Sequence, residues 1–198
     1  QTYILTSPLY SEGVRTAINN DTVSIIELSP AKKLTTVIQE LVDAQNVKTI
    51  GFEEHLTYYE YERFKKLKNT KLKLVSELIE TVREIKSKDE LDKIKKACKL
   101  TDETFSYILP LIKEGMSEQN LAWEMEKYIR EHGGTLAFPT IVAFGKNSAT
   151  PHHHTSDEKL TPNSIILLDF GAQVDYYCSD MTRTIYFGQA STKFKKMY

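Results

Sequence analysis

Asp169 and Asp180 are the two residues of this sequence whose type and spacing could do chemistry. Residues 165–188 have the pattern of two strands joined by a turn, which predicts a β-hairpin with one acid in each arm. If the turn is centred on Val174 and Asp175, Asp169 lies directly opposite Asp180. Directly opposed Cβ atoms are about 4.5–5.5 Å apart, and two like charges at that distance destabilise the hairpin.

The repulsion between the two acids needs compensation. A shared proton or a bound divalent cation could supply it, because carboxylates on rigid strands are ligands that such ions prefer. The alternative is a solvated sheet edge on which Arg183 or a nearby lysine neutralises both acids. The hairpin pattern by itself leaves these interpretations open.

Three consecutive histidines, His152, His153 and His154, precede the hairpin. Imidazole titrates near neutral pH and can donate or accept a proton, so a histidine beside a metal site can polarise a peptide or carry a proton. A solvated loop without a chemical role fits the same run, because histidine is often a surface residue.

The elements that must position these residues fall into two groups, and the first is a small α/β domain. Alternating strand and helix patterns predict strands at 3–6, 23–28, 47–52 and 72–75, and helices at 34–42 and 56–67.

The second group begins with two helices and ends with strands. Ser87 and Glu90 have the spacing of a capping box, and the helix that they open extends to residue 110. Ser117 begins another helix, which the glycine pair at 133–134 ends. A strand at 140–144, a loop at 145–164 and the hairpin follow. We therefore predict domains at 1–84 and 85–198.

Composition narrows the class of protein. The 198 residues are 40% hydrophobic with a net charge of −1, so a nucleic-acid or anionic-membrane footprint is not expected. No apolar run approaches the roughly 20 residues of a membrane span. Cys98 and Cys178 lack metal-ligand spacing and a chain of this length needs no disulfide, so we expect reduced thiols and a cytoplasmic location.

Both ends suggest that the sequence is a fragment. Gln1 is not an initiator Met, and a strand pattern follows it at once. Ser191 is a predicted helix cap, and only about one turn of that helix precedes Tyr198.

Four ordered blocks in the second half carry a family resemblance. They read FPTIVAFGKNSA at 138–149, PH at 151–152, LDFGA at 168–172 and SDMTRT at 179–184. The sequence resembles the pita-bread metallopeptidases, in particular the branch of Xaa-Pro aminopeptidases and Xaa-Pro dipeptidases. Residues 1–82 are similar to the creatinase-like N-terminal domain of that branch. The implied fold is an α/β N-terminal domain followed by the first half of an α+β pita-bread catalytic domain.

The resemblance implies roles for four residues of the second half. Asp169 would bind one metal ion, and Asp180 would bridge two. His152 would be a catalytic residue that faces the substrate, and Thr182 would orient a ligand carboxylate. The three remaining ligands of the family, one His and two Glu, are expected beyond Tyr198.

The resemblance also implies a cofactor and partners. Two divalent ions are expected, with Mn²⁺ first because it suits carboxylate-rich sites and with Zn²⁺ or Co²⁺ as alternatives. Two such ions held close together can activate water for attack on a peptide carbonyl. The implied substrate is a peptide with proline at its second position, and the full-length protein is expected to be a homodimer.

One position departs from the family pattern. Tyr176 stands just past the turn, where the family usually has Gly, and a tyrosine adopts the backbone angles open to Gly only at a cost. A turn geometry different from that of the family would fit this tyrosine, and no metal ligand is lost by the change.

The resulting hypothesis is a metal-dependent Xaa-Pro aminopeptidase, of which these 198 residues lack part of the dinuclear site and are inactive alone. An Xaa-Pro dipeptidase is one alternative, because the groups that read the far end of the substrate are absent. A non-catalytic pita-bread binding module is another, and it would lack the one His and two Glu ligands that a peptidase has downstream. The metal-free creatinase branch is disfavoured because both hairpin acids are present.

Overall fold

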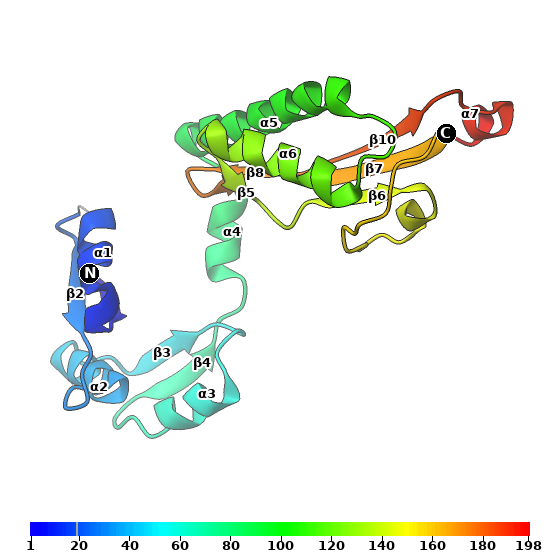
Figure 1. Cartoon of the computed structure of the whole chain (residues 1–198). Helices are drawn as coiled ribbons and strands as arrows, with labels where there is room; N and C mark the ends of the chain where they lie inside the picture. Colours follow the sequence, from blue (N-terminus) through cyan, green and yellow to red (C-terminus); the bar gives the residue numbers. More distant parts are fainter. Residues whose placement is uncertain (19) are drawn as a thin grey trace. The chain divides into compact units, whose positions relative to one another are not determined.

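The computed structural model describes residues 1–18 and 20–198. The chain forms two compact units, Gln1–Ile85 and Lys86–Tyr198. Each unit has its own strands and helices (Figure 1). In the described part of the chain, no helix is both long enough and apolar enough to cross a bilayer.

The first unit is an α/β arrangement with two pairs of parallel strands. Strand β1 (Thr2–Thr6) pairs with β2 (Val23–Glu27), and β3 (Thr49–Phe52) pairs with β4 (Lys71–Leu74). Its helices are α1 (Pro8–Ala17), α2 (Leu34–Ala44), α3 (Tyr58–Phe64) and α4 (Leu78–Glu84). The α/β class predicted for this part is confirmed, although α1 and α4 were not predicted.

Local capping explains why α3 is shorter than the predicted 56–67. The hydroxyl of Thr57 accepts a hydrogen bond from the Glu60 amide, and the Glu60 carboxylate accepts one from the Thr57 amide. This capping box begins the helix after Thr57 rather than at residue 56.

The second unit combines two long helices with antiparallel strands. Its helices are α5 (Lys88–Ile108), η1 (Leu109–Leu111), α6 (Glu118–Glu131), η2 (Gly145–Ala149) and α7 (Thr192–Met197). Its strands are β5 (Thr135–Leu136), β6 (Ile141–Phe144), β7 (Ser164–Phe170), β8 (Ala172–Val174), β9 (Tyr177–Cys178) and β10 (Met181–Phe187). The strand orders are β10-β7-β6 and β5-β8-β9.

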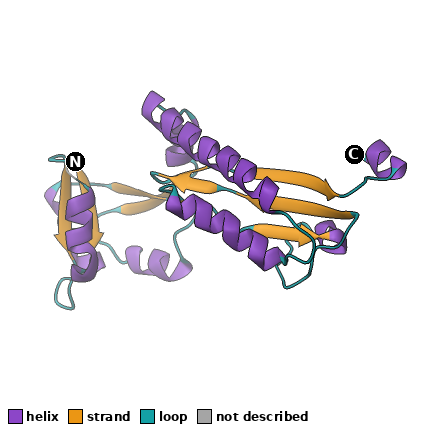
Figure 2. Cartoon of the chain, turned by 45° about the horizontal axis from the view of Figure 1, so that its top comes forward, coloured by secondary structure: helices purple, strands orange, loops and turns teal. Residues whose placement is uncertain are grey.

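The core of the second unit lies between the helices and one face of the strands. Helices α5 and α6 lie side by side across this face (Figure 2). Alternate residues of β7, Ile166, Leu168 and Phe170, are fully buried in one cluster with Leu121 and Met125 of α6. Side chains at the intervening positions of β7, which include Asp169, therefore point away from the helices.

The hairpin has a register that differs from the predicted one. Asp169 pairs with Thr182, and the turn residues are Asp175 and Tyr176, with φ of 49° and 70°. The expectation that the turn is centred on Val174 and Asp175, with Asp169 facing Asp180, is wrong. A two-residue turn of this kind needs positive φ at both central positions, which a β-branched valine adopts only with strain. The turn therefore lies one residue later.

Candidate metal and catalytic site

The side chains of Asp169 and Asp180 project from the same face of the hairpin, at diagonal rather than directly opposed positions. Asp169 alternates with buried neighbours on the central strand, and Asp180 stands between the buried Ser179 and Met181. Thr182, the partner of Asp169, is two residues from Asp180 and so shares its face. Diagonal neighbours on an antiparallel pair lie about 7–8 Å apart, a separation that bound cations can bridge.

Thr182 fixes the orientation of the Asp169 carboxylate. Its hydroxyl Oγ1 donates a hydrogen bond of 2.9 Å to Asp169 Oδ1. Asp169 is half-buried on the central strand β7, where β6 and β10 pair with it on either side. A carboxylate held in this way presents its remaining lone pairs in a defined direction, which is what ligands of a metal ion require.

In the described part of the chain, neither acid is paired with a basic side chain. Within residues 1–18 and 20–198, no ion pair joins Asp169 or Asp180 to a lysine, arginine or histidine. The Arg183 guanidinium instead donates to the Thr182 carbonyl oxygen at 2.9 Å and lies 5.9 Å from the centre of the Phe105 ring. The two acids thus remain available as oxygen ligands.

The acid pair fits part of a divalent metal site. Two carboxylates offer the oxygen donors that Mg²⁺, Ca²⁺ and Mn²⁺ prefer. The described part of the chain contains no group of three or more His, Cys, Asp or Glu side chains that could hold an ion. Additional ligands would be needed to complete a coordination sphere.

Two hydroxyl groups bind the hairpin to α5 at Ala172, which lies between Asp169 and Asp180 in the sequence. Thr101 Oγ1 and Ser179 Oγ lie 2.5 Å apart, and both accept from the Ala172 amide, at 3.1 and 3.0 Å. At Gly171 the arms approach so closely that an added Cβ would lie 2.0 Å from the Ser179 carbonyl oxygen. Sequence reasoning missed this network, whose only signal is a hydroxyl residue next to Asp180.

His152 lies on an exposed turn outside the hairpin. The His153 amide closes this turn with a 3.2 Å hydrogen bond to the Thr150 carbonyl oxygen. Among the hydrogen bonds of the described residues, none joins His152 to Asp169 or Asp180. The structure therefore brings Asp169, Asp180 and Thr182 together on one face, while the catalytic role of His152 stays a prediction.

Glu118 is a buried acid that sequence reasoning did not single out. Its side chain has 0% exposure, and five donors surround its two carboxylate oxygens. Burial alone raises the pKa of a carboxyl group, but hydrogen bonds from Asn147, His153, Phe144 and Ser156 together hold the pKa of Glu118 below its ordinary value. A signal was present, since Glu118 lies on the same helical face as the buried Leu121 and Met125.

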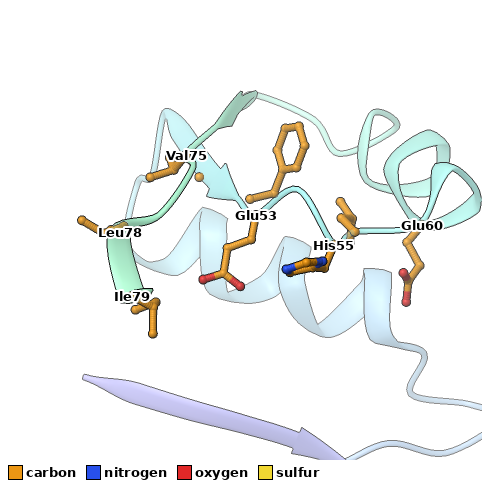
Figure 3. A pocket seen from close by; sticks show the side chains of 9 residues that line it. Glu53, His55, Glu60, Val75, Leu78 and Ile79 are labelled. Carbon is orange, nitrogen blue, oxygen red and sulfur yellow. The ribbon is translucent and has the colours of Figure 1, made fainter. Parts of the chain in front are cut away.

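A separate hollow lies in the first unit. Figure 3 shows Glu53, His55 and Glu60 around it, with Val75, Leu78 and Ile79 on its apolar side. Glu60 is already engaged in the cap of α3. Among residues 1–18 and 20–198, no group of three or more His, Cys, Asp or Glu side chains is placed to hold a metal ion, so these polar residues do not form a metal site.

Comparison with protein families matches both units. Residues 2–85 match the creatinase/prolidase N-terminal domain, and residues 92–198 match metallopeptidase family M24. These two matches define an α/β N-terminal domain followed by a metallopeptidase domain. The chain belongs to metallopeptidase family M24, with a creatinase-like N-terminal domain ahead of the first part of the pita-bread domain. The predicted family and fold class are confirmed.

Individual relatives agree with this assignment. The chain is 37% identical over 162 residues to the uncharacterized peptidase YqhT of Bacillus subtilis, with 80% of this chain and 46% of the relative covered. It is 35% identical over 156 residues to the Xaa-Pro dipeptidase of Pyrococcus furiosus, with coverage of 78% and 45%. The chain thus spans about half the length of these curated relatives.

Solved structures resemble both units. An Xaa-Pro dipeptidase from Bacillus anthracis matches with a TM-score of 0.86 and 31% identity, covering 97% of this chain and 54% of that one. An X-Pro aminopeptidase from Thermotoga maritima matches with a TM-score of 0.84 and 28% identity, covering 98% and 55%. Relatives with both kinds of named specificity therefore share this fold.

Proposed function

We propose that the complete protein is a metal-dependent peptidase that hydrolyses the peptide bond before a proline. The observation that carries the proposal is the pair Asp169 and Asp180, which share one face of the hairpin without a basic partner among the described residues. Membership of family M24 and similarity to proteins named Xaa-Pro dipeptidase and X-Pro aminopeptidase support it.

Each site residue has a role in this proposal. Asp169 and Asp180 would hold divalent ions, with Mn²⁺ preferred because all the ligands on the hairpin are oxygens. Divalent ions bound there would polarise a peptide carbonyl and lower the pKa of a water molecule. Thr182 holds the Asp169 carboxylate in place, and His152 would contact the substrate peptide and carry a proton.

The 198 residues by themselves are expected to be inactive. Two carboxylates do not reach the coordination number that fixes a divalent ion, and the described residues offer no third ligand in the same group. The resemblance to the pita-bread metallopeptidases implies that one His and two Glu complete the site in the complete protein.

Within this class we propose an Xaa-Pro aminopeptidase, with an Xaa-Pro dipeptidase as the alternative. The two differ in substrate length, because a dipeptidase must bind the free carboxylate that directly follows the proline. Comparing an Xaa-Pro dipeptide with an Xaa-Pro-Xaa tripeptide separates them. Cleavage of the tripeptide favours the aminopeptidase, and cleavage of the dipeptide alone favours the dipeptidase.

The proposal predicts the effect of Asp180→Asn in the complete protein loaded with Mn²⁺. Removal of one carboxylate charge should lower kcat/KM on Xaa-Pro peptides by more than about a hundredfold, since even residues that only orient a ligand contribute roughly 10- to 100-fold. Asp175→Asn is the matched control, because Asp175 is exposed in the turn of the same hairpin. It should change kcat/KM by less than about twofold.

Unchanged activity of the Asp180→Asn variant would defeat the metal assignment. A complete protein that binds Xaa-Pro peptides but cleaves none would instead support the non-catalytic binding module. A homodimer, a cytoplasmic location and domains at 1–84 and 85–198 stay predictions.

A further inference from the structure

Glu118 belongs to none of the roles above, yet it is a fully buried charged residue in the second unit. We infer that Glu118 is the positioning residue for His152, because its carboxylate fixes the segment 144–156 that carries this histidine. The inference rests on the proposed function insofar as His152 contacts the substrate. The anchoring itself is a property of the second unit and can be tested without activity.

The carboxylate of Glu118 binds the segment at both ends. Oε1 accepts from the Phe144 amide at 2.7 Å and from Asn147 Nδ2 at 2.9 Å. Oε2 accepts from His153 Nε2 at 2.8 Å and from the amide and hydroxyl of Ser156 at 2.8 and 2.7 Å. One side chain on α6 therefore connects the end of β6, the short helix η2 and the histidine loop.

Helix α6 is held by the core, where its Leu121 and Met125 are fully buried, and backbone bonds at its start add further ties to the loop. The Glu118 amide donates to the Glu158 carbonyl oxygen at 3.1 Å, and the Gln119 amide donates to the Ser156 carbonyl oxygen at 3.1 Å. Ser117 caps the helix by accepting from the Asn120 amide at 3.1 Å. Movement of the loop away from α6 would therefore break these backbone bonds together with those to the Glu118 carboxylate.

A second tie holds the far end of the segment to β6. The hydroxyl of Thr155 donates to the Thr140 carbonyl oxygen at 3.0 Å and accepts from the Val142 amide at 3.0 Å. The segment is therefore held at residues 144, 147, 153, 155 and 156. Its exposed tip, which contains Pro151 and His152, lies between the ties.

The donor set requires a charged carboxylate at position 118. All five groups around the two oxygens are donors, so an ionised acid, which only accepts, satisfies every one of them. A glutamine would replace one of the two oxygens with an NH₂ group, whose N–H groups would face the donors that this oxygen now binds. Glu118→Gln therefore keeps the shape of the side chain while removing about half of the anchor.

Amide hydrogen exchange of the 198-residue chain tests the anchoring. In Glu118→Gln we expect the amides of Phe144, His153 and Ser156 to exchange at least about tenfold faster, while the amide of Leu168 in the hairpin core changes by less than about threefold. Glu114→Gln is the matched control, because it makes the same change at an exposed position just before α6. It should leave all of these amides unchanged.

A milder variant keeps the test decisive if Glu118→Gln does not fold. His153→Phe removes one donor from Glu118 Oε2 and preserves ring packing at a position that is 14% exposed. Exchange at His153 and Ser156 should still rise by at least about threefold. Unchanged exchange in both folded variants would overturn the inference, as would equal acceleration at Leu168, which indicates general destabilisation.

Kinetics of the complete protein separate positioning from stability. At a temperature where circular dichroism shows every variant folded, Glu118→Gln should lower kcat on an Xaa-Pro peptide by about 10- to 100-fold, with KM within about threefold. A residue that only stabilises the fold would leave kcat per folded molecule unchanged, and that result overturns the role in catalysis. If amide exchange is faster in Glu118→Gln but the complete wild-type protein cleaves no Xaa-Pro peptide, the anchoring by Glu118 is supported and the proposed function is defeated.

Discussion

Tyr176 holds a backbone conformation that its residue type disfavours. Its φ is 70°, and the residue is 91% exposed, so packing does little to offset the strain. A left-handed conformation costs a non-glycine residue about 1–2 kcal/mol. The tight turn is therefore retained although Tyr176 departs from the family pattern, and Tyr176 bears the energetic cost.

The variant Tyr176→Gly is expected to stabilise the chain by about 0.5–1.5 kcal/mol, because Gly adopts positive φ freely and Asp-Gly favours this turn. Urea unfolding followed by circular dichroism measures the change. Tyr176→Ala is the control, since it removes the same ring without gaining the freedom of Gly and should be close to neutral. Stabilisation by Ala as large as that by Gly would contradict the strain argument.

Thr182 provides the second prediction at this scale. Thr182→Val removes the hydroxyl that donates to Asp169 Oδ1 and keeps the β-branched shape that suits a strand. Mn²⁺ affinity of the complete protein, measured by calorimetry, should fall about 10- to 100-fold. Thr184→Val makes the same change on the same face of β10 and should leave the affinity unaltered. Equal affinities for all three proteins would remove Thr182 from the site.

Individual site residues differ in how far the sequence could reveal them. Asp169, Asp180 and Thr182 stand in blocks whose order and spacing carry the family resemblance, so their types could be selected without coordinates. Glu118 could not be assigned partners, because its five donors come from residues up to 38 positions away. Only the fold brings such distant groups to one carboxylate.

At the scale of elements, the hairpin was predictable but its register was not. Alternation of residue types predicts strands, yet pairing depends on which two residues form the turn. A shift of the turn by one residue moved the partner of Asp169 from Asp180 to Thr182. Because this shift changes the pairing by two positions, both acids remain on one face.

The anchor between α6 and the histidine loop should respond to acid. The folded pKa of Glu118 is lowered, so its stabilising contribution is present above the ordinary carboxyl pKa and is lost as the pH falls through the folded value. At pH 7, Glu118→Gln should destabilise the chain by about 2–3 kcal/mol, typical of lost hydrogen bonds to a charged group. The difference from wild type should shrink as the pH falls below about 4.

Urea unfolding at pH 7 and at pH 3.5 checks this dependence. Glu114→Gln serves again as the exposed counterpart and should show no such trend. A destabilisation by Glu118→Gln that is equally large at both pH values would indicate that the charge of Glu118 plays no part.

At the scale of the whole molecule, the two units have unequal cores. Among the buried hydrophobic residues of the described chain, only Val37 and Val42 belong to the first unit, while the second unit has one extended cluster. Burial of apolar surface is the main favourable term in folding. The first unit is therefore expected to open at a lower free energy than the second.

Native-state amide exchange tests this difference. Amides in the pairing of β1 with β2 should exchange at least about tenfold faster than those in the pairing of β7 with β10. Equal protection of the two pairings would mean that the units unfold as one cooperative body, contrary to the separate cores. The measurement needs no ligand and no activity.

The organisation into an α/β first part and a hairpin-bearing second part could be predicted from the sequence, because hydrophobic periodicity and capping residues are local signals. Ser87 with Glu90 and Ser117 both cap helices as predicted. Helices α1 and α4 were missed, and Glu77, the residue before α4, has a φ of 57° and no side-chain cap hydrogen bond. The domain boundary between residues 84 and 85 stays a prediction, and the two compact units of the structure meet between Ile85 and Lys86.

The anchoring of segment 144–156 has a consequence for how the family can vary. Asn147 and His153 bind opposite oxygens of the same carboxylate, so the stretch between them is closed into a noncovalent ring. Inserting or deleting a residue inside that ring would detach one of its ends. Length variation among relatives should therefore collect outside positions 147–153, and relatives that change length inside them should also have replaced the acid that corresponds to Glu118.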